Sequence, residues 1–154
     1  MAFDSALVDA LFASVVSEAQ RLGIFTQVIG HEPKNAPPGG LSCACWWADI
    51  SPARTSGLAS TDGRVEFAAR VYSNMLQEPQ DGIDPDILSA VGLLIGAYTD
   101  GFTLGGTVME VDLLGAYGDA LSAKAGYINH DNRLFRIGEI TVPVIVNDLW
   151  TQAS

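Results

Sequence analysis

The chain has 154 residues, of which 48% are hydrophobic and 17% are charged, so it can bury a core and is not predicted to be disordered. Its 18 acidic and 8 basic residues give a formal net charge of −10, which argues against a protein that grips a phosphate backbone or an anionic membrane surface. No apolar run approaches the roughly 20 residues of a membrane span, and the N-terminal stretch lacks the basic start of a secretory signal, so we expect a protein that stays in the cytoplasm or in a particle assembled there.

The first half of the chain is predicted to form one helix and three strands. Apolar residues at spacings of three and four predict an amphipathic helix over residues 4–22, with a cap at Asp4 or Ser5 and a left-handed end at Gly23. Strands are predicted over residues 24–29, 41–50 and 64–73. They are joined by a proline-rich loop over residues 31–40 and by residues 51–63, which are interpreted as a loop or as the tip of an extended hairpin.

The second half is predicted to form another helix and three further strands. Residues 85–98 show helical periodicity after Asp84, which is placed to cap the helix, and Gly92 and Gly96 are predicted to allow close approach to the sheet. Residues 107–116 are predicted as a strand, and residues 125–129 and 134–146 as a hairpin that turns through 130–132. Pro143 is expected at an edge or bulge because it lacks an N–H donor.

The element order is therefore helix, three strands, helix, three strands, with antiparallel hairpins. It predicts a single α+β domain over residues 1–154, in which one mainly antiparallel sheet carries two principal helices on one face.

Residues that could carry chemistry are sparse. His31 and His130 each precede a carboxylate, but both lie in turn-rich segments, where a general acid or base lacks a rigid partner. Cys43 and Cys45 share one face of a strand, cannot easily bridge each other and lack the further ligands of a zinc site, so they are predicted to be small buried side chains. We therefore expect no catalytic residue, no cofactor, no metal and no enzymatic activity.

The candidate functional residues are instead suited to contacts with neighbouring subunits. Three long loops, over residues 30–40, 51–63 and 74–84, carry apolar residues, which favours loops ordered by neighbours; loops that fold back over the same domain are the open alternative. Trp46 and Trp47 are adjacent and must face opposite sides of a strand, so one of them needs a cover. The candidate interface residues are Pro37, Pro38, Trp46, Trp47, Arg54, Leu58, Arg64, Arg70, Tyr72, Met75 and Leu76.

Four stretches resemble tail-terminator or neck proteins encoded by phages of actinobacteria and related prophages. They are GHEPKNAPPGGLSCACWW (30–47), SGLAS (56–60), RVEFAARVYSNMLQEPQDGIDPDIL (64–88) and LGAYGDALSAKAGYINHDNRLFRIGEITVPVIVNDLW (114–150). The resemblance covers most of the chain, and its motifs identify relatives and not a reaction.

The resemblance implies a tail terminator of a long, non-contractile tail: a small α+β protein that forms a homohexameric ring on the end of the tail tube. Such a ring stops tube polymerisation, offers an attachment surface to the head-side connector and lets DNA pass through its lumen without specific binding. The implied partners are other copies of the chain, the tail tube protein and the head-tail connector or head-completion protein, with no membrane partner, in a virion assembled in the host cytoplasm.

Three alternatives stay open at this point. The nearest is a head-completion or tail-to-head joining neck protein. A tube or capsid-decoration subunit is a second, and a small cytoplasmic hydrolase that uses His31 or His130 is a third.

Overall fold

The computed structural model describes residues 3–37, 40–57, 59–74 and 80–151. Within them the order of helices and strands is the predicted one. The elements are α1 (Ser5–Leu22), β1 (Gln27–Ile29), β2 (Leu41–Ser56), β3 (Ser60–Asn74), α2 (Ile83–Asp100), β4 (Glu110–Val111), β5 (Ser122–His130) and β6 (Arg133–Thr151), with short 3-10 helices η1 (Gln80–Gly82) and η2 (Leu104–Gly106).

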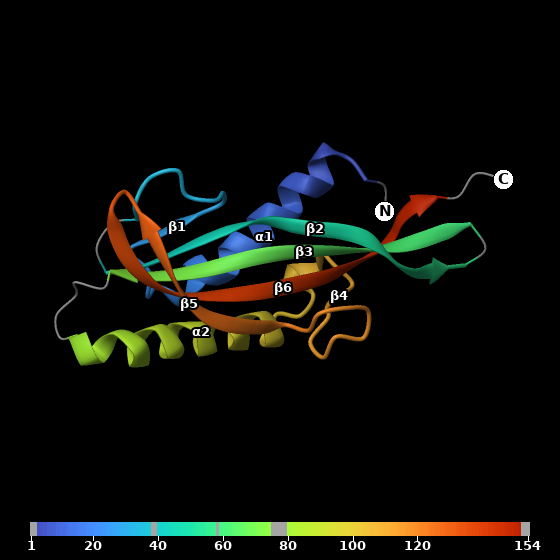
Figure 1. The fold of residues 1–154 in the computed structure, drawn as a ribbon. Helices are drawn as coiled ribbons and strands as arrows, with labels where there is room; N and C mark the ends of the chain where they lie inside the picture. Colours follow the sequence, from blue (N-terminus) through green and yellow to red (C-terminus); the bar gives the residue numbers. More distant parts are fainter. Residues whose placement is uncertain (1–2, 38–39, 58, 75–79, 152–154) are drawn as a thin grey trace.

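The strands form one sheet in the order β1-β2-β3-β6-β4, with β5 also paired to β6 (Figure 1). Only the β1–β2 pair is parallel among these strands; the others are antiparallel. The prediction of an α+β fold with a mainly antiparallel sheet is confirmed. Neither described helix is apolar enough to cross a membrane.

Helix α1 has the ends that the sequence predicts. The Asp4 carboxylate accepts a hydrogen bond from the Leu7 N–H at 2.9 Å and so satisfies a donor of the first turn. Gly23 ends the helix with φ of 66°, a conformation that costs glycine little. The side chains of Leu7, Leu11, Val15 and Ala19 form its buried stripe.

Strands β2 and β3 are longer than predicted. Most of residues 51–63 belong to these two strands and extend the hairpin that they form. The extended-hairpin alternative is thus the correct one. Polar contacts hold this part of the ladder: the buried Asp62 carboxylate accepts from Arg54 Nε at 2.7 Å and from the Asp148 N–H at 2.9 Å. The hairpin tip extends beyond the helices, together with the end of β6 (Figure 1).

Two expectations about α2 are wrong. The helix begins at Ile83 with Gly82 as its N-cap and no side-chain cap, while the Asp84 carboxylate accepts from Arg136 Nε at 2.9 Å. Gly92 and Gly96 are exposed, and a Cβ at either would meet no atom within 4 Å. The close approach of α2 to the sheet is instead at Gly138, where a Cβ would lie 2.5 Å from Val91 Cγ2.

The predicted strand over residues 107–116 is mostly wrong. It is reduced to β4, and the chain then forms a loop up to residue 121. The predicted β5–β6 hairpin is confirmed, and its turn residues Asp131 and Asn132 have φ of 53° and 60°.

Pro143 is not at an edge, since β6 is an interior strand. It lies where the neighbour of β6 changes from β5 to β4, and its carbonyl accepts from the Asp112 N–H at 2.8 Å. Its missing N–H therefore falls at a break in the ladder, where the loss costs little.

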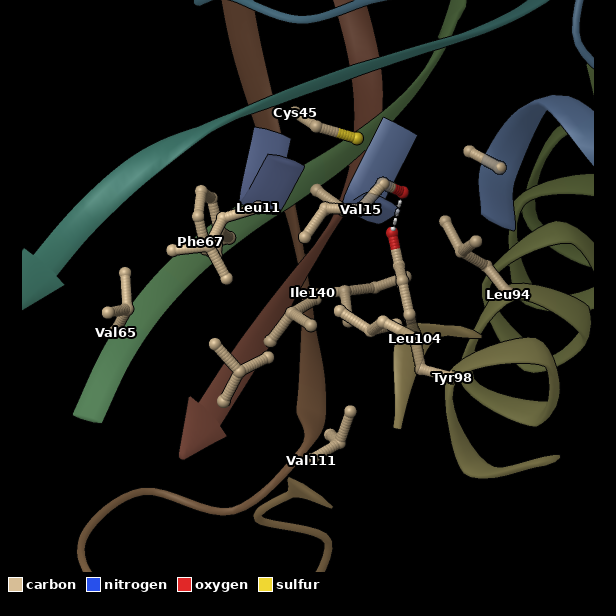
Figure 2. Packing of buried hydrophobic residues seen from close by; sticks show 14 of the residues in the cluster. Leu11, Val15, Cys45, Val65, Phe67, Leu94, Tyr98, Leu104, Val111 and Ile140 are labelled. Atoms are coloured by element: carbon tan, nitrogen blue, oxygen red, sulfur yellow. Dashed lines mark hydrogen bonds between the residues drawn. The ribbon is translucent and has the colours of Figure 1, made fainter. Parts of the chain in front are cut away.

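The main core lies between one face of the sheet and both helices (Figure 2). Side chains of β3 and β6 that share this face meet the stripes of α1 and α2. The buried Tyr98 hydroxyl of α2 donates to the Val15 carbonyl of α1 at 2.8 Å and so ties the two helices together. Cys43 and Cys45 are free and buried in the same core, which confirms their predicted packing role.

The opposite face of the sheet carries a smaller apolar cluster of Ala44, Tyr72, Phe135 and Ile137. The sheet curls at this end, where the β5–β6 hairpin approaches the segment after β1 (Figure 1). His130 Nε2 lies 3.1 Å from the Pro33 carbonyl, and the Asp131 carboxylate accepts from the Ala36 N–H at 2.7 Å. Part of the sheet's second face is thereby covered by the chain itself.

Candidate interaction surfaces

His31 lies in the segment after β1, as the sequence predicts, whereas His130 is the last residue of β5. His31 Nδ1 lies 3.1 Å from the Glu32 carbonyl, and His130 contacts the Pro33 carbonyl and the Asp131 carboxylate. In the part of the chain that the structure describes, no three His, Cys, Asp or Glu residues gather in a way that could hold a metal ion. The absence of an enzymatic role stays a prediction.

The two adjacent tryptophans face opposite sides of β2, as predicted. Trp46 is opposite Ala68 in β3 and is covered by the Arg70 guanidinium, which lies 4.8 Å from the ring centroid. Arg70 is held by the Glu139 carboxylate, with 2.8 Å between Nε and Oε1. Trp47 lies on the face of the sheet that α1 packs against, and it is 52% exposed.

Three of the predicted interface residues are buried within their own subunit. Pro37 is buried, Tyr72 is 1% exposed and Arg64 is 6% exposed. Burial raises the pKa of the Tyr72 hydroxyl, which accepts a hydrogen bond from Arg70 Nη1 at 3.2 Å. These side chains brace their own subunit and offer no surface to a neighbour in this conformation.

The other predicted interface residues differ in what they offer. Trp47 is half exposed, and Arg54 is exposed but donates to Asp62 and to the Tyr117 hydroxyl. Trp46 and Arg70 are half-buried against each other. Four further residues lie outside the described part of the chain: Pro38, Leu58, Met75 and Leu76. Contact of any of these residues with a partner stays a prediction.

An apolar pocket lies beside Trp47, between the start of α1 and strands β2 and β3. We call it the β2-side pocket; its volume is about 230 Å³, and it is lined by Phe3, Val8, Leu11, Phe12, Trp47, Ile50, Val65 and Phe67. All of these side chains are apolar, and Phe3 at its rim is 49% exposed. The sequence pattern indicates Trp47 as a candidate contact, but nothing in it connects Trp47 with Phe3, which is 44 positions away.

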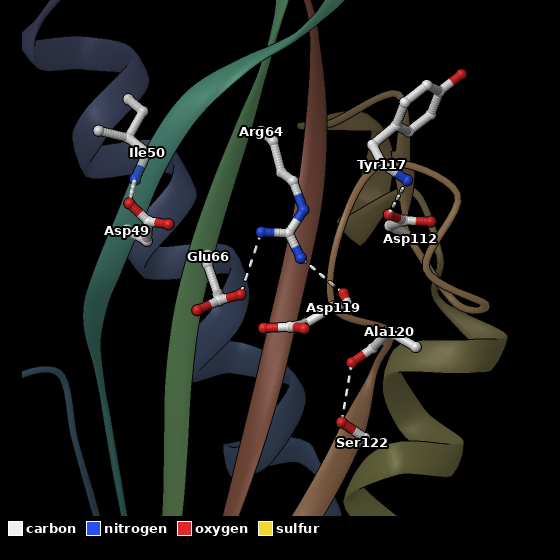
Figure 3. Close-up of polar contacts among 9 residues, drawn as sticks. All are labelled: Asp49, Ile50, Arg64, Glu66, Asp112, Tyr117, Asp119, Ala120 and Ser122. Carbon is white, nitrogen blue, oxygen red and sulfur yellow. Dashed lines mark hydrogen bonds and ion pairs between the residues drawn. The ribbon is translucent and has the colours of Figure 1, made fainter.

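The loop over residues 112–121 forms a second surface, on the β4 side of the sheet (Figure 3). The buried Asp112 carboxylate accepts from the Ala116 N–H at 2.7 Å and from the Tyr117 N–H at 3.0 Å. Arg64 Nη2 donates to the Asp119 carbonyl at 2.6 Å. The loop presents Leu114, which is 94% exposed. Sequence reasoning missed Leu114 because it placed this residue in a strand.

The outer face of α2 is a third surface. Leu88 is 72% exposed and Leu93 is 49% exposed, with Gly92 and Gly96 between and beside them. A largely apolar groove of about 490 Å³ runs along this helix, with Ala123, Ala125 and Gly138 of the sheet among its lining residues. The sequence shows the spacing of these glycines but not that they face outward.

Comparisons with known proteins identify no family for this chain. No protein-family model matches it, and no curated protein matches it. Among solved structures, it is similar to a chain described as "Virion of native gene transfer agent (GTA) particle", with 13% sequence identity over 92% of this chain and 98% of that chain and a TM-score of 0.42.

Proposed function

We propose that the chain is a structural virion subunit, a tail terminator that caps the tail tube of a long-tailed phage as a homohexameric ring. The ring halts tube polymerisation and presents an attachment surface to the head-side connector, and DNA passes through its lumen. The protein acts by shape and carries out no reaction.

One observation carries this proposal: exposed large apolar side chains lie on several separate sides of the domain. Phe3 and Trp47 lie at the β2 side, Leu114 at the β4 side, and Leu88 and Leu93 on the outer face of α2. Grouped exposed apolar residues mark interaction sites, as Phe3 and Trp47 do at their shared pocket. Leu114 stands alone, but at 94% exposure it presents almost its whole side chain. A ring subunit needs two different lateral surfaces and a further one for the axial neighbour.

The sequence resemblance supports the same role. The four stretches that resemble tail-terminator or neck proteins cover most of the chain, including parts of β2 and β3, all of β5 and nearly all of β6. They also include the 112–121 loop from Leu114 onward. The proposed partners are other copies of the chain, the tube protein and the connector.

The charge of −10 suits a lumen that DNA must cross without binding. Six copies concentrate this negative charge in one ring, and a negative wall repels a polyanion. We propose that Asp and Glu side chains line the hole. A lumen lined by neutral or basic side chains would remove this part of the proposal.

A head-completion or tail-to-head joining protein is the alternative that the same resemblance supports. The two roles differ in the partner: a terminator binds the end of the tube, whereas a completion protein binds the ring on the portal side. Co-sedimentation with purified tubes and with purified connector rings separates them.

The direct test adds the purified chain to polymerising tube protein and measures tube lengths by electron microscopy. Termination predicts shorter tubes with extra density at one end. Tubes whose length is independent of the chain would overturn the proposal. The His31→Ala, His130→Ala double variant is the matched control, and it should cap tubes as well as the original chain because neither histidine has a catalytic role in this account.

A further inference from the structure

The 112–121 loop is built as a rigid support for Leu114. The Asp112 carboxylate accepts two backbone N–H groups of the loop, and Arg64 holds its far side at the Asp119 carbonyl. The first residue is also tied to the sheet, because the Asp112 N–H donates to the Pro143 carbonyl. Despite this bracing, Leu114 at the tip is 94% exposed. A fixed loop loses little conformational entropy when its apolar tip enters a pocket.

The β2-side pocket has the properties of a receptor for such a side chain. Its lining is wholly apolar, so a polar or charged group would lose its hydration there without gaining a partner. Its volume of about 230 Å³ exceeds the roughly 150 Å³ of engineered apolar cavities that accept benzene. A branched aliphatic side chain therefore fits.

Leu114 and the β2-side pocket lie toward opposite edges of the sheet, at about the same position along the strands. The strand register places Ile50, Val65, Val144 and Val111 in one row across four strands. Ile50 lines the pocket at one end of this row, and Leu114 follows Val111 by three residues at the other. Figure 3 shows the same arrangement, with Ile50 on β2 at one side and Asp112 and Tyr117 at the other.

A second copy of the chain is the occupant that these positions favour. A closed ring uses heterologous contacts, in which one side of a subunit fits the opposite side of the next. Each copy carries a charge of −10, so two copies repel each other overall, which disfavours a contact held by ion pairs and favours an apolar one. Exposed acids lie near both surfaces: Asp119 is in the loop, and Asp49 precedes the pocket residue Ile50 on β2, although the register with Glu66 places it on the other face of the sheet.

We propose that Leu114 of one copy inserts into the β2-side pocket of the next copy and so forms the repeating contact of the ring. This inference rests on the ring of the proposed function and names the surfaces that close it. Because the contact is apolar and joins two copies of like net charge, raising the salt concentration should strengthen it, whereas a contact made by ion pairs would weaken.

Cross-linking between two variants, each with one added cysteine, tests the contact. Ala48→Cys lies beside the pocket and Ala116→Cys lies beside Leu114, and both alanines are exposed. Cys43 and Cys45 are 1% exposed and should not react in the folded chain. With a short bismaleimide, a mixture of the two variants should give a covalent dimer, whereas neither variant alone should. Ser89→Cys, on the exposed face of α2, mixed with Ala116→Cys is the matched control and should give no dimer.

A second measurement uses the oligomeric state by native mass spectrometry. Leu114→Asp should lose the oligomer, with association weakened at least about tenfold, as for a central hot-spot residue. Leu88→Asp, which changes another exposed leucine, is the control and should retain the oligomer. Both changes are at exposed positions, and circular dichroism verifies that the variants fold.

The outcomes separate this inference from the proposed function. A wild-type oligomer that gives no cross-link in the mixture and survives Leu114→Asp would overturn the inference and leave the ring intact. A covalent dimer from Ala116→Cys alone would replace the head-to-tail contact by a symmetric one and would also overturn it. A chain that stays monomeric with and without tubes, and gives no cross-link, would overturn both.

Discussion

Replacing Asp112 by alanine should destabilise the chain by about 3 kcal/mol. The buried carboxylate accepts two backbone N–H groups, at 2.7 and 3.0 Å, and hydrogen bonds to a charged group contribute about 1.5–3 kcal/mol each. Ala116 is exposed, so its freed N–H gains a hydrogen bond to water. The loss for the two bonds together is therefore about 3 kcal/mol, which is twice the lower limit for one bond. For a chain of this size, about 3 kcal/mol corresponds to a decrease in Tm of about 6–12 °C.

Urea unfolding followed by tryptophan fluorescence measures this loss. Asp112→Asn keeps one acceptor oxygen and should lose about half as much free energy of unfolding. Asp119→Ala is the matched control in the same loop, because Arg64 contacts only the backbone carbonyl of Asp119 and the side chain is exposed; its effect should stay within about 0.5 kcal/mol. An Asp112→Ala variant as stable as the original chain, or an Asp119→Ala variant equally destabilised, would refute the reasoning.

Three further predictions concern the core and are checked by the same unfolding measurement. Tyr98→Phe removes the hydroxyl that donates to a buried carbonyl of α1 and should cost about 1 kcal/mol; no loss would mean that this bond does not hold the helices together. Gly63→Ala places a Cβ 2.2 Å from Leu149 Cδ2 and should cost about 1–3 kcal/mol through overpacking; an unchanged midpoint would show that the side chain moves aside freely. A hydrogen bond with Cys45, and then burial, raise the pKa of the Cys43 thiol, so the folded chain keeps a proton that the unfolded chain loses. The free energy of unfolding should therefore fall as pH rises above about 8.5, and Cys43→Ala should flatten this dependence; a slope that persists unchanged in the variant would contradict this assignment.

The elements with strong periodicity could be predicted from the sequence. Helix α1 has its apolar stripe, its Asp4 cap and its Gly23 end where the pattern predicts them. The β5–β6 turn follows from the tolerance of Asp131 and Asn132 for positive φ. These features depend on residues close together in the chain, which is why local patterns suffice.

Features that depend on distant partners could not be predicted. Asp84 has the right position for a helix cap, but Arg136, 52 residues away, binds its carboxylate instead. Residues 107–116 have a mixed pattern that is interpreted as a strand, but the Asp112 side chain binds the following backbone and offers it an alternative to the ladder.

The candidate interface could be predicted only in part. Arg64 and Tyr72 alternate with core residues of β3 and are predicted at an interface, but the 112–121 loop covers Arg64, and Tyr72 belongs to the small apolar cluster on the second sheet face. The adjacent tryptophans indicate Trp47, but nothing indicates Leu114, because exposure at the tip of a braced loop has no signature in the local sequence.

Electron microscopy of particles assembled without this chain tests the central proposal most directly. If the chain caps the tail tube and joins it to the connector, such particles should have overlong tails or tails that lack heads. Tails of normal length attached to heads would show that the chain neither stops the tube nor joins it, and would contradict the account.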